Sequence, residues 1–262
     1  MTTFYWLIAI VLIVFACLSL NMFPKFYAKT TKKLYLRGII LILIIIVQVS
    51  HFISYAMEKG FNNIISYFYL QVCTITSFAL IILLIYPKKI FLECFGPLAI
   101  TGPLFALAVP LNYYPSSFWY YEYYFGHGLI TYGYLYVYWY GITNYKFDHR
   151  TVSRSVIILI IIYLCAELFN NYFGTEYILD TYWYMTCLFP EGWHMKEWSR
   201  PAISAVFFFV IGPVVILIGV LPLWFFKPIY DLQQNQFLHP TWSNVAWAKI
   251  KKRKKPSNKV LH

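Results

Sequence analysis

Long apolar segments recur along almost the whole chain, and they restrict its fold more than any other feature. A helix needs about 20 mostly apolar residues to cross the hydrocarbon core of a bilayer. Seven segments of the 262-residue sequence meet this requirement and predict an all-α membrane protein, a bundle of seven transmembrane helices. They are residues 4–21, 37–57, 64–86, 90–110, 121–143, 153–173 and 203–226. Since only 12% of all residues are charged, about half the share in soluble domains, a soluble fold is excluded.

The basic residues predict how this bundle is oriented in the cell membrane. Of the 21 Lys and Arg residues, 18 follow the first, third and fifth segments or lie in the C-terminal tail. Membrane proteins keep such residues in the cytoplasm, so we expect the N-terminus outside and the C-terminus inside. We expect one transmembrane domain at residues 1–230 and a basic tail at 231–262. The tail is expected to bind anionic lipid of the inner leaflet and no specific nucleic acid.

The fourth segment is interrupted by glycine and proline at Gly96-Pro97, Gly102-Pro103 and Pro110. Proline lacks an amide donor and leaves a carbonyl free one turn earlier, so this helix is expected to be kinked or locally broken. The freed groups need protein or water around them. Glu93 begins the segment and is expected to face solvent or to cap its first turn.

Polar side chains inside the segments are costly in hydrocarbon and are therefore candidate functional residues. They lie in the outer half of four segments and predict one shared polar centre: His51, Gln71, Cys73, His127, Glu167, Asn170 and Asn171. The last three share a helix face. Cys73 is expected roughly 14 Å below the start of the third segment. Down the fifth segment, His127, Thr131, Tyr134 and Tyr138 recur at helical spacing and are interpreted as the wall of a polar and aromatic groove.

These residues also have simpler explanations. Membrane cysteines are usually small packing residues, and a histidine often forms a hydrogen bond between helices. The cysteines form no pair with the spacing of a zinc site, so no metal or other cofactor is expected. A polar cluster beside a broken helix is also how transporters build substrate sites.

Several short motifs occur in a fixed order between residues 71 and 177. Gln71 precedes Cys73, Glu93 is followed by Gly96 and Gly102, His127 lies between two glycines, and Asn170 precedes Gly-Thr-Glu-Tyr at 174–177. The order resembles the bacterial YwaF-like integral membrane family and its eukaryotic relatives, the transmembrane protein 164 family, over roughly residues 35–226. The family pattern has histidine at the position of Gln71, serine at Gly126 and asparagine at Glu176.

The resemblance implies a phospholipid acyltransferase. Cys73 would be the nucleophile and His127 its base, moving a fatty acyl chain between glycerophospholipids and lysophospholipids through a thioester. Gln71, Glu167, Asn170, Asn171 and His51 would form the supporting polar network. The alternative is a non-enzymatic transporter or ligand-binding membrane protein, in which Glu167 and His127 form a polar site and Cys73 only packs.

Overall fold

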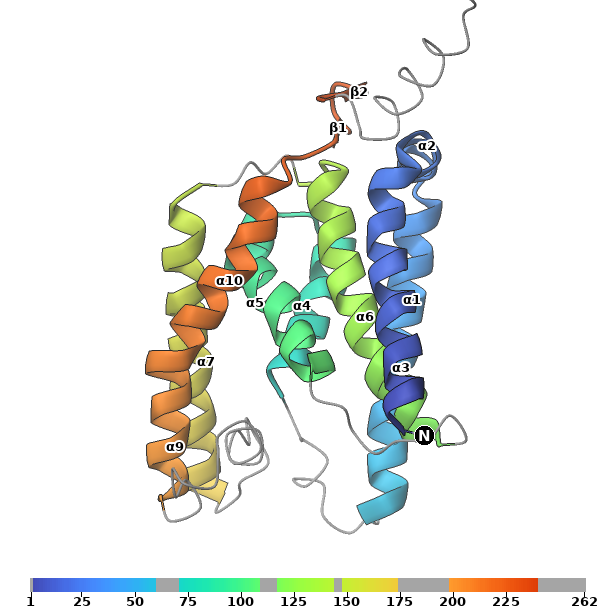
Figure 1. Cartoon of the computed structure of the whole chain (residues 1–262). Coiled ribbons are helices and arrows are strands. Elements are labelled where there is room, and N and C mark those ends of the chain that lie inside the picture. The colour runs from blue at the N-terminus through green and yellow to red at the C-terminus, as the bar shows by residue number, and fades with distance from the viewer. Residues whose placement is uncertain (1, 60–70, 109–116, 144–147, 174–197, 240–262) are drawn as a thin grey trace, which may run out of the picture.

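The structure, a computed structural model, describes residues 2–59, 71–108, 117–143, 148–173 and 198–239 (Figure 1). The Gly-Thr-Glu-Tyr motif at 174–177, most of the loop after it and the basic tail from residue 240 lie outside these ranges. The helices are α1 (Thr2–Met22), α2 (Pro24–Lys32), α3 (Tyr35–Lys59), α4 (Val72–Ile85), α5 (Lys89–Ala108), α6 (Phe118–Trp139), α7 (Arg150–Phe173), α9 (Arg200–Val206), the π-helix η4 (Phe207–Ile211) and α10 (Gly212–Phe225). A short hairpin, β1 (Tyr230–Asp231) and β2 (Gln236–Phe237), follows.

Among the described residues, five helical stretches are long and apolar enough to cross a membrane. They are Thr3–Met22, Tyr35–Ser54, Lys89–Ala108, Arg150–Phe173 and Pro201–Phe225, and α4 is a shorter apolar helix. Helix α6 is 22 residues long but rich in tyrosine, which lowers its hydropathy. The chain is therefore an all-helical, multi-pass membrane protein, as the sequence predicted.

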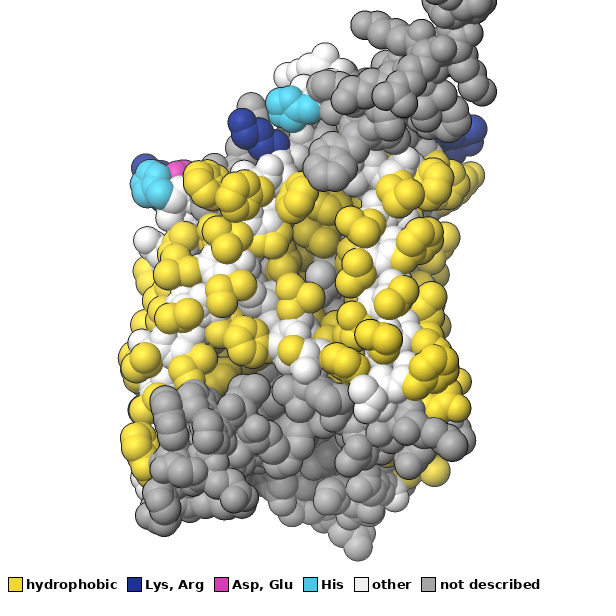
Figure 2. Space-filling model, viewed as in Figure 1, with side chains coloured by type: hydrophobic (Ala, Val, Ile, Leu, Met, Phe, Trp, Pro, Cys, Tyr) yellow, Lys and Arg dark blue, Asp and Glu magenta, His cyan; other side chains and the backbone are white. Residues whose placement is uncertain are grey.

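On the face of the bundle seen in Figure 2, apolar side chains form a belt. In that view the coloured Lys and Arg side chains lie beyond one end of the belt. This end carries α2, the first residues of α5 and α7, and the hairpin after α10 (Figure 1). An apolar belt with charges beyond its end is the surface that a bilayer requires.

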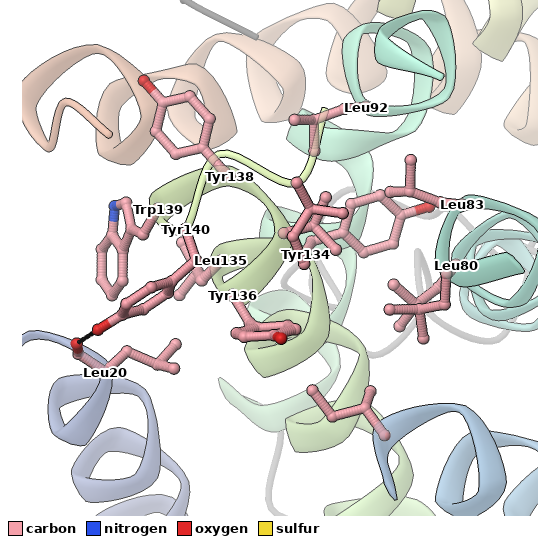
Figure 3. Packing of buried hydrophobic residues seen from close by; sticks show 14 of the residues in the cluster. Leu20, Leu80, Leu83, Leu92, Tyr134, Leu135, Tyr136, Tyr138, Trp139 and Tyr140 are labelled. Atoms are coloured by element: carbon pink, nitrogen blue, oxygen red, sulfur yellow. Dashed lines mark hydrogen bonds between the residues drawn. The ribbon is translucent and has the colours of Figure 1, made fainter. Parts of the chain in front are cut away.

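Helix α6 lies at the centre of the bundle and packs against α1, α3, α4 and α5. Most of its tyrosines are buried in the protein core. Tyr134, Tyr136 and Tyr138, with Tyr140 directly after the helix, expose 1% or less of their surface (Figure 3). The hydroxyls reach backbone carbonyls of four neighbouring helices: Tyr120 to Tyr5 (2.8 Å), Tyr123 to Ala106 (2.6 Å), Tyr134 to Thr76 (3.1 Å), Tyr138 to Leu223 (2.5 Å) and Tyr140 to Leu20 (2.5 Å). These hydrogen bonds hold the helices together where no water competes.

This packing corrects the interpretation of the stripe on α6 as a groove wall. Thr131 is 4% exposed, and its hydroxyl donates to the carbonyl of Ala99 at 3.4 Å. The hydroxyls of Tyr134 and Tyr138 likewise donate to the carbonyls of other helices. These residues do recur at helical spacing on α6. Their side chains pack against protein, because α6 is surrounded by other helices.

Helix α5 is continuous from Lys89 to Ala108, with Pro97 and Pro103 inside it. Each proline leaves the carbonyl four residues earlier without its usual amide partner. Beside Pro97, the Ser155 hydroxyl of α7 lies 2.8 Å from the Glu93 carbonyl and 2.9 Å from that of Cys94. Beside Pro103, Thr131 supplies the bond to Ala99. Hydroxyls on adjacent helices thus replace the lost amide donors, as the sequence argument required.

Glu93 is not at a solvent-facing helix end, which corrects a second expectation. It is 4% exposed, and its carboxylate pairs with the guanidinium of Arg154 on α7. Because α7 packs along α5, Arg154 near the start of α7 reaches the buried carboxylate. The ion pair and the Ser155 bonds fix these two helices to each other.

Candidate functional site

Cys73 is the second residue of α4, which begins at Val72 after the extended residue Gln71. Cys73 therefore lies in the first turn of α4, whereas the sequence predicted a helix over 64–86 with the cysteine further along it. The first amides of a helix have no acceptor within it, and the first bond in α4 runs from the Ile75 amide to the Gln71 carbonyl at 3.0 Å. The thiol thus lies where the helix dipole favours negative charge, an environment that activates cysteines.

The Cys73 thiol faces α5 at Gly102. A Cβ atom built on Gly102 would lie 3.8 Å from the sulfur and would meet nothing else within 4 Å. The thiol therefore lies directly across from this glycine of α5. Gly102 belongs to the glycine pair of the sequence motif, so the fold brings two of the motifs into contact.

His127 lies on α6 and is half-buried. Its Nδ1 lies 2.5 Å from the carbonyl oxygen of Tyr123, one turn earlier, and its ring packs on the Tyr123 ring with centroids 4.5 Å apart. A carbonyl only accepts hydrogen bonds, so Nδ1 carries the proton and donates it. The neutral ring consequently presents Nε2 as its basic nitrogen, and its orientation is fixed by the backbone.

Glu122 is the functional candidate that the sequence argument missed. Its Oε1 lies 3.0 Å from Nδ1 of His51 on α3, and the two side chains are 16% and 17% exposed. One signal was available in the sequence: an acidic residue inside a predicted span, five residues before His127, is costly to bury.

Gln48 lies one turn before His51 on α3. It is 7% exposed, and its Oε1 atom is buried without a hydrogen-bond partner. A buried amide oxygen in this state offers an acceptor to a ligand or water. Gln71, at the start of α4, is half-buried and makes no side-chain cap on its helix.

Glu167, Asn170 and Asn171 lie elsewhere in the bundle. They are on α7, which packs against α5 and α10, whereas α3 packs against α4 and α6. Figure 1 shows α7 and α3 on opposite sides of the molecule. The electrostatic neighbour of Glu167 is Tyr163 on its own helix, and Asn171 is exposed. The structure therefore pairs His51 with Glu122. It places Cys73 and His127 on α4 and α6, two helices that pack against each other, whereas Glu167 lies on α7, which packs against α5 and α10.

The described residues hold no group of three His, Cys, Asp or Glu side chains close enough to bind a metal ion. What the site offers is a thiol at a helix N-terminus, an imidazole fixed through Nδ1 on an adjoining helix, and an imidazole–carboxylate pair between α3 and α6. These are the components of nucleophilic acyl transfer and of proton transfer.

Comparison with known proteins yields one match. The model of the TMEM164 family matches residues 1–188, a stretch that includes every residue of the site. No curated protein and no solved structure matches the chain.

Proposed function

The chain belongs to the TMEM164 family, and we propose that it is a phospholipid transacylase. It moves a fatty acyl chain between glycerophospholipids through a thioester on Cys73. The observation that carries this proposal is the position of the Cys73 thiol in the first turn of α4, facing Gly102, with His127 held through Nδ1 on the adjoining helix α6. A cysteine that only packs does not need a helix N-terminus.

In the first half-reaction, His127 Nε2 accepts the proton of the Cys73 thiol. The sulfur attacks the ester carbonyl of a donor phospholipid, and the amides at the start of α4 donate to the oxyanion that forms. When the carbon–oxygen bond breaks, the leaving lysophospholipid takes the proton from His127. The acyl chain remains on the sulfur as a thioester.

In the second half-reaction, the hydroxyl of an acceptor lysophospholipid loses its proton to His127 and attacks the thioester. The carbon–sulfur bond breaks, the acyl chain moves to the acceptor, and the proton returns to sulfur. Glu122 stabilises the imidazolium that exists between these steps, and His51 holds the carboxylate. Catalytic distances commonly shorten when substrate binds, so the unliganded site need not hold the groups in contact.

For the topology we propose seven crossings, with the N-terminus outside and the C-terminus in the cytoplasm. The five long apolar helices, the tyrosine-rich α6 and the shorter α4 supply the crossings. The lysines and arginines at one end of the bundle support a cytoplasmic assignment for that end. We further propose that α5, the fourth crossing, is weakened at Pro97 and Pro103, where other helices complete its hydrogen bonds.

The test is acyl exchange by the purified protein in liposomes. An isotope-labelled phospholipid is the donor, a lysophospholipid is the acceptor, and mass spectrometry follows the label. We expect transfer by wild type, none by Cys73→Ala or His127→Ala, and slower transfer by Glu122→Gln. Cys17→Ala, a half-buried cysteine on α1, and Glu167→Gln are matched controls and should retain full activity.

Intact-mass measurement separates this mechanism from the alternatives. The masses of wild type, His127→Gln and Cys73→Ala should be compared after incubation with the donor lipid. A thioester on Cys73 appears as an added acyl mass that hydroxylamine removes and that is missing from Cys73→Ala. Transfer that survives in Cys73→Ala refutes the thioester. If wild type neither transfers nor carries an acyl group, whereas Glu122→Gln or Glu167→Gln abolishes solute uptake, the protein is a transporter.

A further inference from the structure

A cavity of about 480 Å³ lies at the basic end of the bundle, apart from the site around Cys73. Its lining comes from the ends of α6 and α10 and from the hairpin: Tyr138, Leu223, Trp224, Lys227, Pro228, Leu238 and His239. His127 and Tyr138 are eleven residues apart on α6, a separation of roughly 16 Å along the helix axis. The cavity is thus a second site.

The hairpin forms one wall of this cavity and is firmly attached to α6. The Ile229 amide donates to the Trp139 carbonyl at 2.8 Å, and the Leu238 amide donates to the Ile229 carbonyl at 2.9 Å. Gly141, with a φ of +59°, lies directly against the backbone of Tyr230, where a Cβ atom would meet the carbonyl oxygen at 2.5 Å. Only glycine allows this approach.

The hairpin brings two nitrogen-bearing side chains to the same cavity. Lys227 follows α10 directly, and His239 follows β2, so they lie on either side of the hairpin in sequence. Among the described residues, none of those that line the cavity is acidic. Two such side chains beside one cavity, with no carboxylate in this described lining, favour an anionic ligand.

The cavity lies at the end of α10, where the terminal carbonyls of a helix attract cations. The Leu223 carbonyl there accepts from the Tyr138 hydroxyl at 2.5 Å, and the Phe226 carbonyl accepts from Trp139 Nε1 at 3.3 Å. The side chain of Lys227 is exposed and lines the cavity, so its ammonium can reach a ligand there.

We propose that this cavity binds the phosphate group of a phospholipid headgroup. Lys227 and His239 donate to the phosphate oxygens, whereas Leu223, Leu238 and the indole of Trp224 contact the glycerol and the first carbons of the acyl chains. Its place at the end of the apolar belt matches the level at which headgroups lie. A pocket of this volume is in the usual range for small-molecule sites.

The test measures lipid retention by the full-length protein, a readout that does not depend on acyl transfer. Delipidated protein in detergent is incubated with phosphatidylglycerol or with diacylglycerol, which lacks phosphate, and bound lipid is counted by native mass spectrometry. We expect retention of phosphatidylglycerol over diacylglycerol. Lys227→Gln with His239→Gln should weaken it about ten-fold, the loss expected for a charge-assisted hydrogen bond. Lys29→Gln, on the exposed face of α2, should not.

Two outcomes overturn the proposal. Equal retention by wild type and the double variant means that the cavity does not hold the headgroup. Displacement of the lipid by millimolar inorganic phosphate means that the ligand is free phosphate. The substituted side chains are at the surface, so the fold should be unchanged, and an unaltered unfolding midpoint of the double variant confirms this.

Discussion

Replacing Arg154 by methionine should destabilise the bundle strongly. Glu93 is 4% exposed on α5, and Arg154 is the partner of its carboxylate. Methionine retains the length of the side chain but leaves a buried carboxylate without a counter-charge. Breaking such a pair from one side costs about 3–5 kcal/mol. We expect a loss of this size in the free energy of unfolding, measured by denaturant titration in mixed micelles.

The matched control is Arg150→Met, one turn earlier on the same helix. Its side chain is 68% exposed and lies 3.9 Å from Asp148 at the surface, so its removal should cost no more than about 1 kcal/mol. The double variant Glu93→Met/Arg154→Met removes both charges and should recover most of the loss. A cost below about 1 kcal/mol for Arg154→Met, or a double variant as unstable as the sum of its single changes, would refute the reasoning.

Two further predictions concern packing and pH. Gly219→Ala places a Cβ atom 2.9 Å from the Pro97 carbonyl carbon and 3.0 Å from Thr101. Helices α10 and α5 must then separate, and a thermal-stability assay should show a loss of about 1–3 kcal/mol. The control Gly96→Ala, whose Cβ atom has its nearest contact at 3.5 Å, should be tolerated in the same assay. Burial and the neighbouring Asp231 raise the pKa of Tyr230 in the hairpin above 10.0. The unfolded chain therefore releases this proton first, and stability should fall as pH rises through about 10 and above. Tyr230→Phe should reduce that alkaline loss in unfolding titrations, and an identical loss would contradict the assignment.

The candidate site shows how far single residues can be read from sequence. Cys73 and His127 were predicted because a polar group in an apolar segment is costly wherever the helix packs. Their neighbours are harder to assign, because periodicity gives the face of a helix but not the helix that it meets. Glu167 was grouped with them on depth and on its helix face, whereas the fold packs α7 against α5 and α10. Glu122 was overlooked at the edge of a span, and only the approach of α3 gives it His51 as a partner.

The sequence by itself determined that the chain crosses a membrane several times and that its basic residues lie toward one side. Both properties follow from the cost of placing polar groups in hydrocarbon, a cost that each segment bears independently of the others. Tertiary structure decided which carbonyls the tyrosines of α6 bond, which arginine pairs with Glu93, and where α4 begins relative to Cys73. These depend on contacts between helices distant in sequence, whose energies arise only once the bundle has packed.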